Sequence, residues 1–393
     1  MTKRYLFDAR VIQDHFPGIA RYAYNLLAAM LDALHDDESL CVLHDPTAQN
    51  TRFDWLRLRH PRLTLIAHIA PVFHPMTLLR TPPTAGGSAA QHYPYYVRPY
   101  FGASRRASLT TIHDLIPLLQ QEFAASAKDR LLARVLIGLA VRASAIVITV
   151  SEASARDLRR FWPRARLVVI PEAADPIFTP QPPERCAAVR IKYNLPERFT
   201  LYLASNKPHK NLVRLVEAWA MLSAQLPESQ PEVLVIAGHY DPRYPQAQAR
   251  AAALGMTAQV RFIGEVSNAD LPSLYSACSL FVFPSLYEGF GLTPLEAMAC
   301  GAPVACSNAS SLPEVVGDAA LLFDPTRPAE IAATCARALA DPALRAELRA
   351  RSLAQAARFT WSDAARRTLA AYREASRIAS TPSPSVQQRA PLG

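Results

Sequence analysis

With 393 residues, the chain is too long for one compact hydrophobic core, and its length favours two domains. Half of the residues are hydrophobic and 19% are charged, which excludes extensive disorder and predicts a globular protein. The net charge of +9 is diffuse: residues 1–175 hold 21 Lys and Arg against 15 Asp and Glu, and no dense basic run specifically supports nucleic-acid binding.

The N-terminal residues give no sign of an export signal. The first stretch turns polar at Asp8 before an apolar signal-peptide core develops, and no run approaches the roughly 20 apolar residues of a spanning helix. The six cysteines are scattered without a C-x-x-C pair, as expected for reduced core residues rather than a disulfide framework or a zinc site. These features predict a cytoplasmic protein.

Short apolar runs alternate with helical patterns through the first half of the chain. Between the first two runs, Ile19, Tyr22, Leu26 and Met30 belong to one stripe of i, i+3, i+4 spacing and predict a helix. Short apolar runs of this kind are typical of parallel strands that are buried on both faces of a sheet. The predicted strands are residues 5–11, 40–44, 63–70, 109–116, 145–150 and 167–170.

A proline-rich segment, residues 171–196, interrupts this alternation and predicts an interdomain linker without regular elements. The alternation then resumes, with a helix over the stripe of Leu212, Leu215 and Trp219. The fold class is therefore α/β, with two doubly wound, Rossmann-like domains that face a central crevice, and ligands are expected at the carboxyl ends of the strands. The strands predicted in the second domain are residues 200–204, 233–237, 260–263, 280–283 and 303–306.

The C-terminal part divides into two segments of different composition. Residues 328–376 are alanine-rich and helical in pattern, whereas residues 377–393 have little to bury and predict a disordered tail.

The loop after the predicted strand at residues 280–283 carries the strongest chemical signal. Thr293 as N-cap, Pro294 as first helical residue and Glu296 three residues after the cap form a helix-start pattern, so backbone amides and the helix dipole favour an anion there. Glu296 has two interpretations, a capping-box residue or a ligand-binding carboxylate. Glu288, at the strand end, has no helix to cap. Because carboxylates accept hydrogen bonds from hydroxyls, the pair predicts a ligand with both phosphate and hydroxyl groups, such as a sugar nucleotide.

Three other clusters lie at predicted strand ends. Lys207 and Lys210 precede a predicted helix with Asn211 as a candidate N-cap, and they can neutralise a diphosphate, although ordinary solvation explains a single loop lysine. Gly18 lies at the corner between the first strand and helix, where a close approach to a ligand and a plain turn are both compatible with glycine. His113 and Asp114 follow a buried strand, and the histidine is either a substrate contact or a structural residue.

These motifs together resemble a known family. The Glu288–Glu296 stretch resembles the E-x7-E motif of retaining glycosyltransferases with the GT-B fold, of the GT4 type. The similarity extends over nearly the whole chain and is closest in style to bacterial polysaccharide and O-antigen mannosyltransferases. The other similar segments are Gly18–Tyr22, His113–Asp114, Val150–Ser154, Pro208–Asn211 and Ser311–Val315.

The resemblance implies a role for each matching residue. Glu288 and His113 are the implied catalytic residues, Glu296 holds the ribose hydroxyls, and Lys210 binds the donor diphosphate. Gly18 approaches the phosphates from the first domain. The other implied donor-binding residues are Lys207, Asn206, Ser205, Phe290, Gly291, Leu292 and Thr293.

The resemblance also implies the roles of the domains. Residues 1–175 form the acceptor-binding domain, residues 176–360 form the donor-binding domain, and the helix of residues 361–376 crosses back to the first domain. Two departures bear on the donor site. Ser205 stands where many relatives have an arginine five residues before the lysine, and Glu172-Ala173 replaces an asparagine-glycine pair.

The expected reaction is transfer of a hexose, with mannose from GDP-mannose as the favoured donor, to a glycan or lipid-linked glycan in polysaccharide biosynthesis. No DxD-type motif is present, and the lysine and helix dipole can supply positive charge, so metal independence and the absence of any cofactor are expected. The basic first domain predicts peripheral contact with the anionic inner face of the plasma membrane. The alternatives are a sugar-nucleotide epimerase or phosphorylase with the GT-B fold and a non-catalytic sugar-nucleotide sensor.

Overall fold

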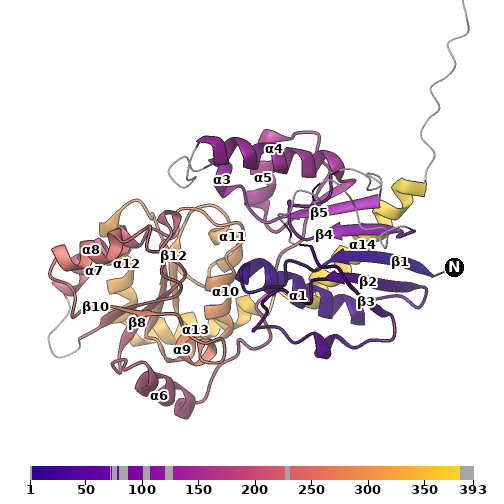
Figure 1. The fold of residues 1–393 in the computed structure, drawn as a ribbon. Coiled ribbons are helices and arrows are strands. Elements are labelled where there is room, and N and C mark those ends of the chain that lie inside the picture. Colours follow the sequence, from indigo (N-terminus) through magenta and orange to yellow (C-terminus); the bar gives the residue numbers. More distant parts are fainter. Residues whose placement is uncertain are drawn as a thin grey trace, which may run out of the picture.

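Two α/β lobes lie side by side in the computed structural model, and the chain crosses between them twice (Figure 1). The structure describes residues 2–70, 72, 78, 87–100, 107–119, 127–225 and 231–380. Residues 381–393 of the predicted tail lie outside this range. Residues 377–380 of that predicted tail are helical, because the last helix continues to Ser380.

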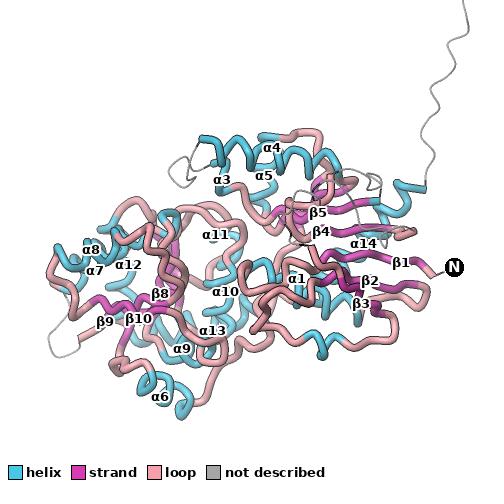
Figure 2. Tube along the Cα trace, in the orientation of Figure 1, coloured by secondary structure: helices cyan, strands magenta, loops and turns pink. Residues whose placement is uncertain are grey.

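The first lobe is built on a parallel sheet that has seven strands among the described residues, in the order β3-β2-β1-β4-β5-β6-β7. In register, Tyr5 of β1 lies beside Leu40 of β2 on one side and Ala90 of β4 on the other. Helices cover both faces of the sheet (Figure 2). The elements are β1 (Lys3–Asp8), α1 (Pro17–Asp32), β2 (Glu38–His44), η1 (Trp55–Leu58), β3 (Leu63–Ala67), β4 (Ala90–Tyr93), β5 (Ser108–Ile112), α3 (Ile116–Leu119), α4 (Ala127–Ala143), β6 (Ile146–Thr149), α5 (Glu152–Phe161) and β7 (Leu167–Val169).

The second lobe repeats this architecture with six parallel strands in the described part of the chain, in the order β10-β9-β8-β11-β12-β13. The order reverses between β8 and β11, and at such a point the strand ends leave a crevice. The elements of this lobe are α6 (Pro183–Lys192), β8 (Phe199–Leu203), η4 (Pro208–Lys210), α7 (Leu212–Ser223), β9 (Val233–Ala237), α8 (Gln246–Ala253), β10 (Val260–Gly264), α9 (Leu271–Ala277), β11 (Leu280–Phe283), α10 (Leu292–Ala299), β12 (Val304–Ser307), α11 (Leu312–Val316), β13 (Leu321–Phe323), α12 (Pro328–Ala340) and α13 (Pro342–Ala356). The last helix, α14 (Trp361–Ser380), follows them in the sequence.

The predicted strands are all present, and two further strands escaped the pattern. Strand β4 has the sequence Ala-Gln-His-Tyr. All four residues are buried, but two of them are polar, so the segment lacks the apolar pattern of a buried strand. Strand β13 has three residues and offers too little sequence to recognise. The prediction that residues 171–196 contain no regular element is wrong, because α6 begins at Pro183, a residue that the first turn of a helix tolerates.

The last helix, α14, belongs to the core of the first lobe although it follows the second lobe in sequence (Figure 1). Tyr372 is completely buried against Tyr5, and Trp361 donates a hydrogen bond to the Ala174 carbonyl at 2.9 Å. Arg373 donates two hydrogen bonds to the buried carboxylate of Glu38, at 2.8 Å each. Burying each aromatic side chain contributes about 1.5–3 kcal/mol, so α14 is anchored firmly to this lobe.

In the described part of the chain, none of the helices combines the length and the apolar character needed to cross a bilayer.

Candidate active site between the lobes

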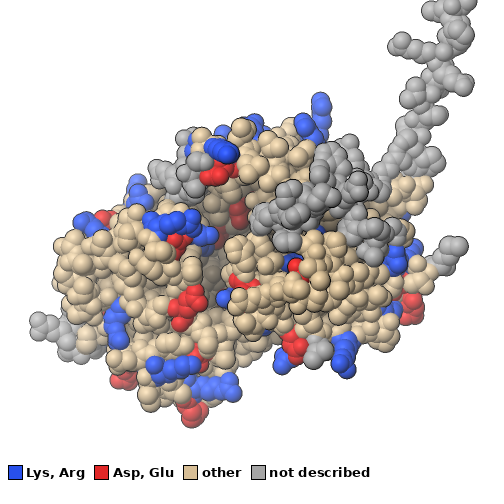
Figure 3. Space-filling view, viewed as in Figure 1, with Lys and Arg blue, Asp and Glu red and all other residues tan. Residues whose placement is uncertain are grey.

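The surface is hollowed where the two lobes meet, with acidic and basic side chains along the edges (Figure 3). Two adjoining cavities, of about 620 Å³ and about 360 Å³, open there and share Gly18, Ser205 and Lys210. We call them the sugar-side cavity, which Glu288 and His113 line, and the nucleoside-side cavity, which Glu296 lines. The structure therefore brings predicted residues of both lobes, among them Gly18, Lys210 and Glu288, into one crevice.

Lys210 and Glu288 meet in the sugar-side cavity. Lys210 ends the short helix η4, and Asn211 takes a left-handed conformation directly after it. The Asn211 side chain donates hydrogen bonds to the Pro284 and Pro325 carbonyls, which fixes the turn. The Lys210 Nζ atom then lies 2.6 Å from Glu288 Oε1, with both side chains largely buried. The two groups share a cavity, as the sugar-nucleotide hypothesis requires.

Asn211 occupies the predicted N-cap position of α7, but its side chain does not cap the helix. Its amide nitrogen donates hydrogen bonds to the two proline carbonyls, and its amide oxygen accepts a hydrogen bond from Arg214 at 3.0 Å. Asn211 therefore ties the lysine turn to the loop that follows β11.

The loop that carries Glu288 is held against the first lobe. Ser151 and Ser154 of the first lobe donate hydrogen bonds to the Gly289 carbonyl, at 2.6 and 3.0 Å. A Cβ atom on Gly289 would lie 2.3 Å from the His113 carbonyl oxygen, so only glycine permits this approach. Ser310 and Ser311, from the second lobe, bond the backbone of Glu288. The contact between the lobes thus fixes the position of the carboxylate.

The prediction that Thr293 caps the next helix is wrong. Helix α10 begins two residues earlier than predicted, at Leu292, and Gly291 occupies the N-cap with a φ of 125°. Because this conformation strongly favours glycine, Gly291 lets the chain enter the helix directly before Leu292. Leu292 and Thr293 line the nucleoside-side cavity, whereas the Phe290 side chain is buried against Phe359.

The capping-box interpretation of Glu296 is also wrong. Its carboxylate accepts a hydrogen bond from the Tyr275 hydroxyl at 3.3 Å and lies 3.4 Å from Arg21 Nη1, which comes from α1 of the first lobe. Burial raises the pKa of Glu296 to about 7, although the charge of Arg21 lowers it. Glu296 is therefore a cavity carboxylate.

His113 lines the sugar-side cavity, but both of its ring nitrogens already have partners. Nε2 donates to the Pro94 carbonyl at 3.0 Å, and Nδ1 lies 2.9 Å from the carboxylate of Glu172. Burial opposes the charged form, yet the hydrogen bond and charge of Glu172 raise the pKa of His113 above its usual value. A bond from this ring to a sugar hydroxyl would have to replace one of these two partners, and the catalytic role of His113 remains a prediction.

The remaining predicted donor residues divide into two kinds. Ser205 lines both cavities, and Lys207 lines the sugar-side cavity with an exposed side chain. Asn206 does not line either cavity. Its side chain bonds the backbone of Asp241 and Tyr244 at 2.7–2.9 Å and thereby fixes the loop after β9. Asn206 consequently shapes the crevice through that loop.

Several residues of the crevice were not predicted. Tyr95, Tyr96, Arg243 and Tyr244 line the sugar-side cavity, and Arg21 lines the other. Arg21 lies within the Gly18–Tyr22 motif, yet its position beside a buried carboxylate of the other lobe leaves no pattern in the sequence. The paired tyrosines and Arg243 lie in loops where sequence periodicity carries no signal.

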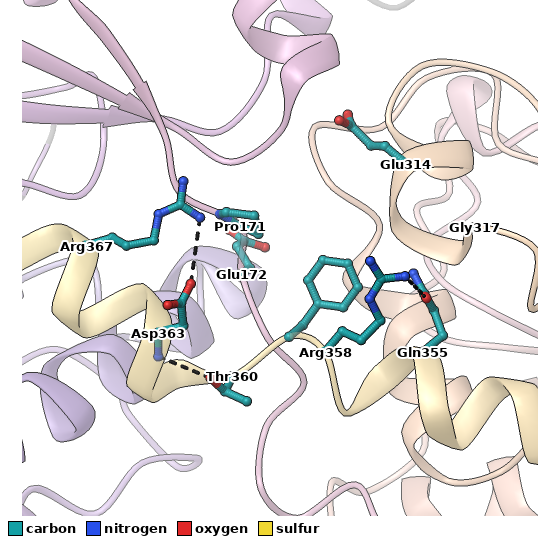
Figure 4. A pocket seen from close by; sticks show the side chains of 10 residues that line it. Pro171, Glu172, Glu314, Gly317, Gln355, Arg358, Thr360, Asp363 and Arg367 are labelled. Atoms are coloured by element: carbon teal, nitrogen blue, oxygen red, sulfur yellow. Dashed lines mark hydrogen bonds and ion pairs between the residues drawn. The ribbon is translucent and has the colours of Figure 1, made fainter.

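A smaller cavity of about 230 Å³ lies where the chain crosses between the lobes (Figure 4). Glu172 and Pro171 line it from the first crossing, and Arg358 and Thr360 line it from the second. Because Glu172 also bonds His113, the crossing region is in direct contact with the active-site crevice.

Two solved structures share the two-lobe arrangement. The sucrose-phosphate synthase of Thermosynechococcus elongatus superposes with a TM-score of 0.70 at 22% identity, over 95% of this chain and 98% of that one. The Anabaena protein HepE, in complex with UDP, gives a TM-score of 0.66 at 20% identity, over 94% and 99%. The fold is therefore the GT-B fold of two facing Rossmann-like lobes, as predicted.

Sequence relatives define the family. Residues 189–355 match the model of the family described as "Glycosyl transferases group 1". The O-antigen chain mannosyltransferase B of Escherichia coli is 32% identical over 382 residues, which cover 94% of this chain and 99% of that protein. The serotype-specific mannosyltransferase WbdA of Escherichia coli is 38% identical over 260 residues, 64% of this chain and 32% of that protein. The chain belongs to the group 1 glycosyltransferases, which confirms the resemblance drawn from its motifs, and it is a glycosyltransferase that uses a nucleotide-sugar donor and a glycan acceptor.

Proposed function

We propose that the protein transfers mannose from GDP-mannose to a glycan acceptor, with retention of the anomeric configuration. The observation that carries this proposal is the meeting of Lys210, Glu288 and Glu296 along one crevice at the strand ends of the second lobe. A cation beside the sugar-side carboxylate and a second carboxylate farther along match a diphosphate flanked by a sugar and a ribose. The mannosyltransferase relatives support mannose as the sugar.

The charges of the site suggest how the bond is broken. Departure of the nucleotide diphosphate leaves extra negative charge, which Lys210 and the first amides of α10 can stabilise. Glu288 is placed to hold the hydroxyls of the sugar as its anomeric carbon becomes oxocarbenium-like. Attack by the acceptor from the same face then gives retention. Contact between the lobes excludes water and favours transfer over hydrolysis.

We also propose that transfer requires neither a divalent metal ion nor a cofactor, because Lys210 and the α10 terminus supply the positive charge that a metal ion would bring. Among the described residues, one group offers metal-type ligands, His35, Asp37 and Glu38. It lies at the amino end of β2, and Arg373 already pairs with Glu38. Transfer rates should be equal with EDTA and with added Mg²⁺ or Mn²⁺, and a loss of more than about tenfold in EDTA contradicts the proposal.

The acceptor is proposed to be a lipid-linked glycan at the cytoplasmic face of the plasma membrane. Helix α4, at the outer edge of the first lobe, exposes Leu131, Leu132 and Val135, with 64%, 53% and 48% of each residue accessible (Figure 1). Lys128 and Arg134 lie on the same helix, so its surface combines apolar and cationic groups, as membrane-surface helices do.

Flotation with vesicles of phosphatidylglycerol and phosphatidylethanolamine tests this contact. Wild type should float at low salt, and Leu131→Ser with Leu132→Ser should reduce floating by at least about threefold. Ile191→Ser removes an exposed side chain from α6 and serves as the matched control. Absence of wild-type flotation at low salt contradicts the membrane contact without affecting the proposed chemistry.

A panel of nucleotide sugars, each with a mannan oligosaccharide acceptor, tests the donor and the reaction. GDP-mannose should raise the melting temperature most and give acceptor-dependent product. Glu288→Gln should bind GDP but lose transfer by roughly 10²–10³-fold, because an uncharged amide stabilises the developing positive charge poorly. Conversion of the donor without acceptor indicates an epimerase or phosphorylase instead. Binding without any turnover indicates a sensor.

A further inference from the structure

Arg21 reaches from the first lobe into the wall of the second. Its Nη2 atom donates a hydrogen bond to Asn268 Oδ1 at 3.2 Å, and its Nη1 atom lies 3.4 Å from Glu296 Oε1. Both side chains of the Arg21–Glu296 pair are 9% exposed. A guanidinium from one lobe thus faces the cavity carboxylate of the other.

The segment between the lobes supports Arg21 on its remaining sides. Asp175 Oδ2 lies 3.8 Å from Arg21 Nη1 and accepts a hydrogen bond from Asn25, one turn farther along α1. The guanidinium also stacks over the Phe178 ring at 5.0 Å. Nη1 is buried and makes no hydrogen bond, so its charge acts on Glu296 and Asp175 without a fixed partner. The position of Arg21 is set by packing rather than by one bond.

The charges around Glu296 are otherwise mostly unfavourable to its ionisation. Burial and the carboxylates of Asp175 and Glu172 raise its pKa, whereas Arg21 and the Tyr275 hydroxyl lower it. Other charged or titratable groups that line the same cavity are Arg52, Lys210, His239 and Glu265. An ionised Glu296 can accept hydrogen bonds from two hydroxyls, whereas the protonated form must use one oxygen as a donor.

We propose that Arg21 is a positioning residue for the donor: from the opposite lobe, its guanidinium keeps Glu296 ionised and oriented so that the carboxylate accepts both ribose hydroxyls. This inference rests on the proposed role of Glu296 as the ribose ligand. It couples donor affinity to the arrangement of the lobes, because separation of the lobes removes the guanidinium of Arg21 from the neighbourhood of Glu296.

The test compares GDP with 2′,3′-dideoxy-GDP, which lacks the hydroxyls assigned to Glu296. Calorimetric dissociation constants are measured from pH 6 to pH 9 for wild type, Arg21→Met and Arg21→Lys. Wild type should prefer GDP, and the preference should weaken as the pH falls through about 7, where Glu296 takes up a proton. In Arg21→Met, this transition should move to higher pH and GDP binding at pH 7 should weaken about fivefold to tenfold, with recovery by pH 9. Arg21→Lys should restore part of the shift.

Two controls separate this inference from the function on which it rests. Arg52→Met removes a cation from the same cavity and should leave the pH of the transition in place. Glu296→Gln should abolish both the preference for GDP and its pH dependence. An unshifted transition in Arg21→Met and Arg21→Lys, with the wild-type preference for GDP intact, overturns the role of Arg21 alone. Equal binding of the two nucleotides by wild type overturns the ribose role of Glu296 and the inference together.

Discussion

The two walls of the crevice are built differently. In the second lobe, Lys210 lies at the end of η4, which follows β8, Glu288 lies in the loop between β11 and α10, and Glu296 lies in α10. In the first lobe, the residues that meet them do so through backbone or through buried side chains. The His113 carbonyl touches Gly289, and the Arg21 guanidinium faces Glu296.

This difference separates two tasks. The second lobe carries the groups that can bind a donor, and the first lobe sets how those groups are held. The hydrogen bonds from Ser151 and Ser154 reach a backbone carbonyl of the Glu288 loop rather than the cavity itself. Changes in the second-lobe wall should therefore remove binding or chemistry, whereas changes in the first-lobe wall should alter geometry and pH dependence.

Lys210→Met should give the largest effect of the four changes considered below. It removes the cation at 2.6 Å from Glu288 and, with it, the proposed partner of the departing diphosphate. We expect the transfer rate to fall roughly 10²-fold or more and GDP binding to weaken. Steady-state transfer and calorimetric binding of GDP measure the two effects.

Lys207→Met is the matched control for that loss. Lys207 lies three residues earlier at the edge of the same cavity, but its side chain is exposed, so its charge is screened by water. Its loss should cost less than about fivefold. Equal losses in the two variants contradict the assignment of Lys210 as the diphosphate ligand and indicate a diffuse attraction of the phosphates.

Gly289→Ala tests the contact between the walls. The added Cβ atom lies 2.3 Å from the His113 carbonyl oxygen and 2.9 Å from its carbon, so backbone must shift in one lobe or the other. We expect the transfer rate to fall about tenfold to 100-fold, because a displacement of this size misplaces Glu288. The melting temperature should also decrease. Gly18→Ala, whose Cβ meets nothing within 4 Å, should not lower the melting temperature, and equal stability of all three proteins contradicts the close contact.

The same contrast explains what the sequence predicted. The strands, the α/β class and the second-lobe residues follow from local patterns, because a buried parallel strand and a loop after it are both local features. Strand β4 was missed because His92 and Gln91 are polar yet buried; His92 bonds Thr111 and Tyr372, partners 19 and 280 residues away. The pairing of Arg21 with Glu296 spans 275 positions in the sequence and has no local signature.

Helix starts were predicted less well than strands. The residues around Thr293 fit a capping box, but the backbone uses Gly291 at φ 125° and releases Glu296 for the cavity. Gly291 and Thr293 are two positions apart, and both residue types are suited to the start of a helix. Residue type alone therefore does not show which of them is the N-cap.

Glu172→Gln tests the pH dependence that the first lobe imposes. The neutral amide removes the charge that raises the pKa of His113 against the opposing effect of burial, so the pKa of His113 should fall. Because a raised histidine pKa stabilises the folded state at low pH and this stability is lost as the pH rises through the folded pKa, Glu172→Gln should destabilise more at pH 5.5 than at pH 8.5. Chemical denaturation at both pH values measures the loss of stability, and NMR titration of His113 measures its pKa. Identical losses at the two pH values contradict a charged His113–Glu172 pair.

Glu314→Gln should have the smallest effect, because it weakens one contact between the lobes without touching the crevice. Glu314 of α11 accepts hydrogen bonds from the Glu152 and Ala153 amides, at 3.0 and 3.1 Å, and so brings a negative charge to the N-terminus of α5 in the other lobe. An amide oxygen can still accept one of these bonds but lacks the charge, so the free energy of unfolding should decrease by about 0.5–1 kcal/mol. Glu184→Gln removes an exposed acidic residue from the first turn of α6 in the second lobe and calibrates the local helix effect. A larger decrease for Glu314→Gln than for Glu184→Gln, together with faster proteolysis between the lobes, attributes the difference to this contact between the lobes. Equal decreases show that Glu314 acts only as a charge at a helix terminus.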